Sequence, residues 1–268
     1  MWGDVTPAER LRSVTRRHVD DDRLAVEAAD ALAGFASEPA SLVVACRRVL
    51  AHHRAHGALW WVCARILAAA EPAAAADLAV RELEADRTAD RLGATLPLLD
   101  ENEVVAVCGW NAIVDEALLE RFDIEAVALR LEGSDPVPAL RRRRSDASVR
   151  VVDPWDPRLE HVARLLVTAY AIGPERALVP FGVPDAMGMI GAAARETWLV
   201  GGAGRALPAR MYDAVIAAVV AEDSEFVYEE ISLERFDRLA GPRGLERPID
   251  GAARIDCPVV PELLRPLN

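Results

Sequence analysis

The sequence predicts an α/β protein in which an N-terminal helical bundle is followed by a Rossmann-like parallel-sheet domain. Residues 1–100 carry apolar side chains three and four positions apart, which is the spacing of one helix face. From residue 101 onward, short apolar and β-branched runs alternate with helical stretches. Because 52% of the 268 residues are hydrophobic, the chain can bury a substantial core. We therefore expect a helical domain over 1–100 and an α/β domain over 101–268.

The helical domain is rich in Ala, Leu, Arg and Glu, which are strong helix formers. Residues that commonly flank helix ends mark the limits of its helices, namely Asp20, Ser37, Gly57 and Pro72. The expected helices are 8–17, 21–35, 39–55, 58–70 and 72–87.

The second domain alternates strands with helices, which predicts a parallel sheet with right-handed crossovers. Strands are expected at 103–107, 124–129, 149–152, 162–168, 197–200 and 226–230, and helices at 112–121, 137–144, 183–195 and 208–220. Such sheets bind ligands beyond the carboxyl ends of their strands, so a site is expected there. Residues 241–268 are rich in Pro and Gly with little periodicity, which predicts an irregular surface strap.

The charged residues exclude several classes of function. The net charge is −12, and all 31 basic residues are arginine, so the chain has no lysine. Chemistry that needs a side-chain ammonium is excluded, including the P-loop lysine and the Schiff base that holds pyridoxal phosphate. An acidic chain of this kind is not expected to bind nucleic acid. The run Arg141 to Arg144 is a local exception, which we interpret as a solvated helix end in preference to a phosphate-binding patch.

The cysteines and the apolar runs indicate a cytoplasmic protein without a membrane span. Cys46, Cys63, Cys108 and Cys257 are widely spaced and form no CxxC pair, which favours reduced thiols. Apolar runs such as 59–70, which Arg65 interrupts, are too short to cross a bilayer. Residues 1–17 lack the apolar segment of a signal peptide.

Three segments are similar to a known superfamily. They are VVAVCGWNAIVDEAL (residues 104–118), LLVTAYAIGPERALVPFGVPDAMGMIGAAA (residues 165–194) and YEEISLERFDRLAGPRG (residues 228–244). Their order resembles that of methylthioribose-phosphate isomerase, ribose-bisphosphate isomerase and the regulatory subunits (alpha, beta and delta) of the eukaryotic translation-initiation guanine-nucleotide exchange factor. The resemblance implies a phosphorylated sugar or nucleotide as ligand and a homodimer formed through the sheet domain.

The same resemblance argues against catalysis by the family's route. In the isomerases a Cys at the end of the first sheet strand and an Asp in a later turn carry the proton transfers, and Cys108 matches the first position. Tyr170 stands where the carboxylate is expected, and Pro180 and Phe181 replace an Asn-Lys pair. A missing general base costs about 10²- to 10⁴-fold in rate. We therefore expect a divergent, non-catalytic homodimer that binds a ligand or regulates a partner.

Two alternatives stay open. One is an isomerase of a phosphorylated pentose in which Cys108 works with another acid, either Asp185 or Asp115. The helix that follows Cys108 would lower the pKa of an exposed thiol, although a small hydrophobe packed at a strand end is the alternative interpretation. The second alternative is a structural protein-protein interaction module with a filled cleft.

The candidate ligand-binding residues lie in turns that follow strands: Gly109, Asn111, Tyr170, Gly182, Gly202, Gly204 and Arg205. The GGAG turn (residues 201–204) precedes a helix, a context in which backbone N–H groups bind anions with Arg205 assisting, or in which the chain merely turns. The turn lacks the full dinucleotide fingerprint, so no cofactor is expected.

One group of residues has the composition of a metal site: His52, His53, His56, Cys46 and Cys63. His52 and His56 are four residues apart, but Gly57 ends the helix and no carboxylate completes a usual motif. We expect polar surface residues here and no metal.

Overall fold

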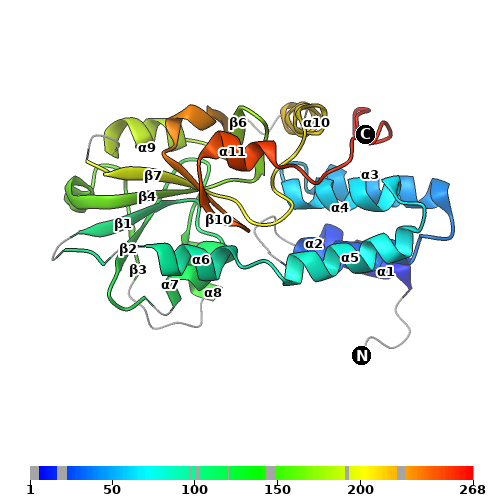
Figure 1. Cartoon of the computed structure of the whole chain (residues 1–268), viewed down its shortest axis with the longest axis horizontal. Helices are drawn as coiled ribbons and strands as arrows, with labels where there is room; N and C mark the ends of the chain where they lie inside the picture. The colour runs from blue at the N-terminus through cyan, green and yellow to red at the C-terminus, as the bar shows by residue number, and fades with distance from the viewer. Residues whose placement is uncertain are drawn as a thin grey trace.

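A computed structural model confirms the predicted fold class, with a helical bundle beside a mostly parallel sheet (Figure 1). It describes residues 6–16, 23–96, 98–100, 103–119, 121–142, 149–190, 193–221 and 227–267. Parts of some predicted elements lie outside these ranges, namely residues 17, 21–22, 120, 143–144, 191–192, 226 and 268. Within these ranges, no helix is both long and apolar enough to cross a lipid bilayer.

The bundle consists of α1 (Pro7–Thr15), α2 (Leu24–Ala33), α3 (Pro39–His52), α4 (Gly57–Ala68) and α5 (Pro72–Glu84). Nearly every side chain of α4 is buried, including that of Trp60. Ala28 and Ala29 of α2 are fully buried, and such small side chains allow neighbouring helices to approach closely. The bundle is therefore built around α2 and α4.

A further helix, α6 (Thr88–Thr95), was not expected from the sequence. It packs against α7 (Ala112–Leu119) of the sheet domain, and a Cβ on its Gly93 would lie 2.6 Å from Ala117 O. An eight-residue helix that contains a glycine is marginal by itself, so packing on α7 stabilises it.

The central sheet has the strand order β10-β9-β7-β4-β1-β2-β3. The parallel strands are β1 (Val104–Cys108), β2 (Glu125–Leu129), β3 (Val149–Val152), β4 (Val162–Thr168), β7 (Glu196–Val200) and β9 (Arg238–Gly241). An antiparallel strand, β10 (Gly244–Glu246), forms one edge. Cys108 is level with Leu129 and Val167, so the carboxyl ends of these strands meet at one edge of the sheet.

Helices cover both faces of this sheet. α6, α7 and α8 (Val137–Arg142) lie on one face, and α9 (Val183–Ile190) and α11 (Pro248–Ala253) lie on the other (Figure 1). Along β1, Val105 and Val107 belong to the core under α7, whereas Val104, Ala106 and Cys108 belong to the core under α9. Alternate side chains of β1 thus pack into two separate hydrophobic cores, one on each face of the sheet.

The prediction that the last strand joins the parallel sheet is wrong. That strand, β8 (Tyr228–Ser232), pairs antiparallel with β6 (Arg176–Pro180), which in turn pairs with β5 (Ala171–Ile172). The Gly173-Pro174 pair sits in the tight turn between β5 and β6, a signal that the sequence analysis missed. These three strands form a small second sheet.

The irregular strap predicted for residues 241–268 is only partly correct, because its first part forms β10 and α11. Beyond α11 the chain is irregular, and it returns to the helical bundle, where Val260 and Leu263 are buried. Arg47 of α3 holds this segment by donating hydrogen bonds to the backbone oxygens of Glu262, Arg265 and Pro266.

Replacing Arg47 with Ala is expected to lower the free energy of unfolding by about 1–3 kcal/mol, because backbone carbonyls of the strap lose charged donors. Urea-induced unfolding measures the loss, and limited proteolysis should cut the strap faster. Arg48→Ala is the matched control, since Arg48 is the next residue of α3 and is exposed. Equal stability of the two variants would contradict the role of Arg47.

Candidate functional site

A cavity of about 280 Å³ lies where the helical bundle meets the carboxyl ends of the parallel strands. Its walls come from α2, α4, the connection from α5 to α6, α7 and the turn after β7. This is the edge at which a parallel sheet is expected to bind a ligand. Of the residues predicted to bind a ligand, Gly202 and Arg205 line this cavity.

One backbone carbonyl holds the start of α4 against the sheet domain. The Gly57 N–H donates to Tyr170 O at 2.8 Å, and Arg205 Nη1 donates to the same oxygen at 3.0 Å. A Cβ at position 57 would lie 2.8 Å from this oxygen, so the approach requires glycine. The ring of Tyr170 packs edge-on against Tyr228, with centroids 4.9 Å apart. Tyr170 therefore positions α4 and Arg205 through its backbone.

His56 is a buried polar side chain in the cavity wall. It is the N-cap residue of α4 and is 1% exposed. Neither ring nitrogen has a hydrogen-bond partner among the described residues. Burial, and then the charge of Arg205, hold the pKa of His56 well below its usual value, so the ring is neutral. An unpaired buried polar group costs about 1–3 kcal/mol, a cost that a bound ligand would remove.

The glycine turn after β7 already binds a carboxylate of the protein itself. Asp86 Oδ2 accepts the Ala203 N–H at 2.7 Å, and Asp86 Oδ1 accepts the N–H and the hydroxyl of Thr88 at 2.9 and 2.6 Å. A Cβ on Gly202 would lie 2.8 Å from Asp86 Oδ2, while Gly204 packs against α4. Asp86 was not among the residues expected at the site, although Asp side chains often accept backbone N–H groups just before a helix.

Exposed charged side chains line the mouth of the cavity: Glu84, Arg87, Asp90 and Glu116. Arg87 and Asp90 form an ion pair at 2.7 Å. Glu84 and Glu116 form no ion pair with any described residue, and Asp86 adds a third carboxylate inside. The cavity therefore carries a net negative charge although Arg205 lies in its wall.

The thiol of Cys108 faces away from the cavity. It shares a core with Val179 and Val183 under α9, whereas the cavity residues Ala89 and Ile113 pack with the core under α7. Cys108 is fully buried, and this burial raises its pKa to about 12. The expectation that the following helix lowers this pKa is wrong, because the alternation along β1 turns the side chain away from α7.

Gly109 and Asn111 shape the turn between β1 and α7. Thr168 Oγ1 donates to Gly109 O at 2.8 Å, which joins this turn to the end of β4. Asn111 Oδ1 accepts the Val114 N–H at 3.1 Å and so caps the first turn of α7. Both residues have local structural partners, and their predicted contact with a ligand stays a prediction.

Gly182 and Asp185 lie at the start of α9, on the face of the sheet opposite α7. The Gly182 N–H donates to Glu229 Oε2 at 3.2 Å, and Asp185 is exposed. Asp115, the other candidate acid, is on α7 and accepts a hydrogen bond from Trp110 Nε1 at 3.2 Å. Asp185 is thus exposed while Cys108 is fully buried, and Asp115 belongs to the helix on the other face of the sheet.

The histidines near α4 have separate surroundings. A ring nitrogen of His52 lies 2.8 Å from Arg48 O, and His53 Nε2 lies 3.0 Å from Val14 O. The expectation of a polar surface is wrong for His53 and His56, which are buried because the chain between α3 and α4 packs inside the protein. In the part of the chain that the structure describes, no three His, Cys, Asp or Glu side chains are grouped to hold a metal ion.

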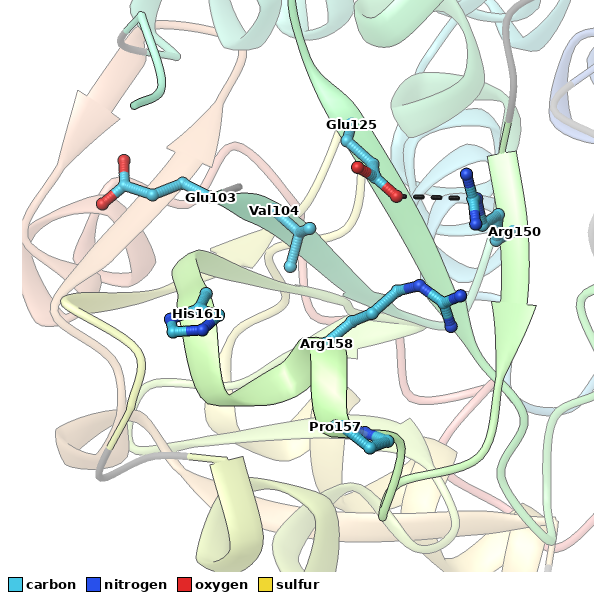
Figure 2. Close-up of a pocket in the computed structure, with 7 residues that line it drawn as sticks. All are labelled: Glu103, Val104, Glu125, Arg150, Pro157, Arg158 and His161. Carbon is cyan, nitrogen blue, oxygen red and sulfur yellow. Dashed lines mark ion pairs between the residues drawn. The ribbon is translucent and has the colours of Figure 1, made fainter. Parts of the chain in front are cut away.

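A second cavity, of about 530 Å³, opens at the amino-terminal edge of the sheet (Figure 2). Its side chains come from the starts of β1, β2 and β3 and from the 3-10 helix η1 (Pro157–His161). Its charges largely pair, Glu125 with Arg150 at 3.5 Å and Arg158 with Asp156 at 2.9 Å. Although this cavity is larger, it lies at the edge that parallel sheets do not use for ligands.

Comparison with known proteins adds a likeness of fold. No family model matches the chain, and no curated protein matches it in sequence. Solved structures do match, and the fold that they define is that of the subunits of translation initiation factor eIF2B.

The translation initiation factor eIF-2B of Pyrococcus horikoshii OT3 is 13% identical, with a TM-score of 0.71 over 92% of this chain and 98% of that one. The eIF2B beta subunit of Chaetomium thermophilum is 12% identical, with a TM-score of 0.64 over 92% of this chain and 90% of that one. A chain of the tetrameric eIF2B-beta2-delta2 complex of C. thermophilum is 14% identical, with a TM-score of 0.65 over 92% and 93%. The predicted resemblance is thus confirmed at the level of the fold.

Cys108 is expected to resist modification in the folded protein. With a pKa of about 12, about one thiol in ten thousand is ionised at pH 8, and burial also blocks the reagent. Labelling with a thiol reagent, followed by mass spectrometry, measures this for each cysteine. Burial also raises the pKa of Cys257 to about 12, but Cys257 is partly exposed, so it should react before Cys108 through its access to the reagent, and unfolding should make both accessible. Rapid native labelling of Cys108 would contradict its position in the core.

The stability of the protein is expected to fall on acidification in part through His56. The pKa of His56 is held below its usual 6.5 in the folded state, so below that pH the unfolded chain gains a proton that the folded chain does not. The free energy of unfolding then falls by up to about 1.4 kcal/mol per pH unit.

Urea unfolding between about pH 7.5 and about pH 5.5 measures this dependence. His56→Gln should make it shallower, whereas His52→Gln should not, because His52 is exposed. The same pH dependence in both variants would show that His56 does not contribute.

Proposed function

We propose that this chain is a divergent, non-catalytic protein of the eIF2B-subunit type that binds a small polar ligand in the cavity beside His56. The observation that supports this most directly is His56 itself, a buried side chain whose ring nitrogens lack partners among the described residues. Folded proteins pair nearly all buried polar groups, so such a side chain indicates that a partner is missing. A small molecule in the adjoining cavity would supply that partner.

Catalysis by the route of the sugar-phosphate isomerases is not part of this proposal. The thiol of Cys108 is buried on the α9 side of the sheet, and burial raises its pKa to about 12. Tyr170 stands at the position of the carboxylate, and the alternative acid Asp185 is exposed on α9. A nucleophile and an acid must reach the same bound molecule to transfer protons, and this geometry does not favour that.

The open cavity supports ligand binding over a purely structural interaction module. A module with a filled cleft would have no space at the carboxyl ends of the strands, whereas about 280 Å³ is open here. Small-molecule sites commonly measure about 300–1,000 Å³, so this cavity suits a ligand at the small end of the range. The phosphorylated sugar or nucleotide expected from the family resemblance belongs among the first ligands to test.

Self-association is the second part of the proposal. One structure with this fold is described as a tetrameric complex of eIF2B beta and delta subunits. That description supports self-association of this chain as a homodimer, and its free cysteines agree with a reducing, cytoplasmic environment. Light scattering coupled to size-exclusion chromatography measures the oligomeric state directly, and a monomer at every concentration would contradict this part.

Thermal-shift measurements with sugars, sugar phosphates and nucleotides test the ligand site. A ligand that binds only the folded state raises the free energy of unfolding by about 2.7 kcal/mol at a hundredfold excess over Kd. His56→Leu should abolish the shift, because it removes both ring nitrogens and keeps most of the volume. His52→Leu is the control and should retain it. If no compound stabilises the wild type, the interaction module becomes the better account.

A further inference from the structure

We infer that the ligand of this site is a hydroxylated molecule the size of one sugar ring, uncharged or carrying an amino group, and without a phosphate. The inference rests on the proposed ligand site, and it departs from the phosphorylated ligand that the family resemblance implies. It is based on three observations. Asp86 already accepts the Ala203 N–H, where an anionic ligand could otherwise bind, and the mouth of the cavity is acidic. Both ring nitrogens of His56 lack a hydrogen-bond partner among the described residues.

Asp86 occupies the place beside the glycine turn (residues 201–204) where an anionic ligand could accept a backbone hydrogen bond. Its Oδ2 accepts the Ala203 N–H at 2.7 Å and lies 2.8 Å from where a Cβ on Gly202 would be. A phosphate would have to displace this carboxylate or lie beside it. Displacement would lose the bonds to Ala203 and Thr88, and proximity would place two negative charges within a few ångströms.

The carboxylates at the mouth of the cavity also disfavour a phosphate, because like charges repel. Arg87 and Asp90 neutralise one another, which leaves the charges of Glu84 and Glu116 without an ion pair among the described residues. An ammonium group is favoured in this environment, and a phosphate is disfavoured.

The interior offers hydrogen bonds that match hydroxyl groups. Arg205 is the cation in the wall, and its guanidinium already donates to Tyr170 O. A neutral imidazole such as His56 presents one N–H donor and one acceptor nitrogen. Hydroxyl groups donate and accept, so a hydroxyl of the ligand can pair with either nitrogen of the ring. A phosphate dianion only accepts and can pair with the N–H nitrogen alone, so the hydroxyls of the ligand are the groups that suit His56.

The volume sets the size of the ligand. About 280 Å³ is slightly below the common range for small-molecule sites. A pentose, a hexose or an amino sugar suits this space, whereas a nucleotide needs room for a base, a sugar and a phosphate. The acidic mouth also disfavours placing the phosphate outside the cavity.

Calorimetric titration with matched pairs of probes tests the inference, namely ribose against ribose 5-phosphate and glucosamine against glucosamine 6-phosphate. Each unphosphorylated sugar should bind more tightly than its phosphate, and glucosamine should bind more tightly than glucose. His56→Leu should abolish binding of the sugars, which places them at this site.

A double variant, Glu84→Gln with Glu116→Gln, tests the role of the mouth. It should weaken glucosamine binding about twofold to fivefold, the effect of exposed charge pairs, while glucose binding changes little. The control is Glu160→Gln with Glu262→Gln, because both residues are exposed and neither lines the cavity. An unchanged affinity for glucosamine in the mouth variant would overturn the preference for an amino group.

The proposed ligand site and the inference that its ligand carries no phosphate fail in different ways. If the phosphorylated member of either pair binds more tightly, and His56→Leu abolishes that binding, the inference is overturned and the proposed ligand site stands. If no member of either pair and no nucleotide binds the wild type, both are contradicted.

Discussion

The carbonyl oxygen of Tyr170 accepts hydrogen bonds from Gly57 of the helical bundle and from Arg205 after β7, and the arrangement of the site depends on this junction. It fixes the first turn of α4 against the carboxyl ends of the strands. His56 immediately precedes that turn and is buried with it. Without this contact the cavity would lose one wall, because α4 provides both His56 and Ala58.

A second constraint is the pleat of the strands. Side chains at the end of β1 point alternately toward α7 and α9, and the thiol of Cys108 falls on the α9 side. A residue can therefore occupy the expected sequence position and still be separated from the cavity by the sheet. Its burial and raised pKa agree with a packing role. A shared fold does not by itself place a thiol where a bound ligand could reach it.

Asp86 sets the charge beside the glycine turn from a distant segment of the chain. The glycine turn after β7 presents its N–H groups beside the start of a helix, which is the usual setting for a bound anion. Here the connection from α5 to α6 brings a carboxylate of the chain to Ala203 and satisfies that donor from within. The Ala203 N–H is therefore already paired, and Asp86 adds a negative charge beside the turn.

The sequence by itself determined the layered architecture, because helical and strand periodicities differ and the alternation of strands and helices permits few topologies. It also determined the edge of the sheet at which the cavity lies, and it pointed to Gly202 and Arg205. It could not indicate that His56 lies inside, because the burial of a single histidine depends on how two domains pack. Asp86 was equally hidden, since its partner Ala203 is more than a hundred residues away. Only the tertiary structure decided these contacts, because they join segments whose separation along the chain leaves no local pattern.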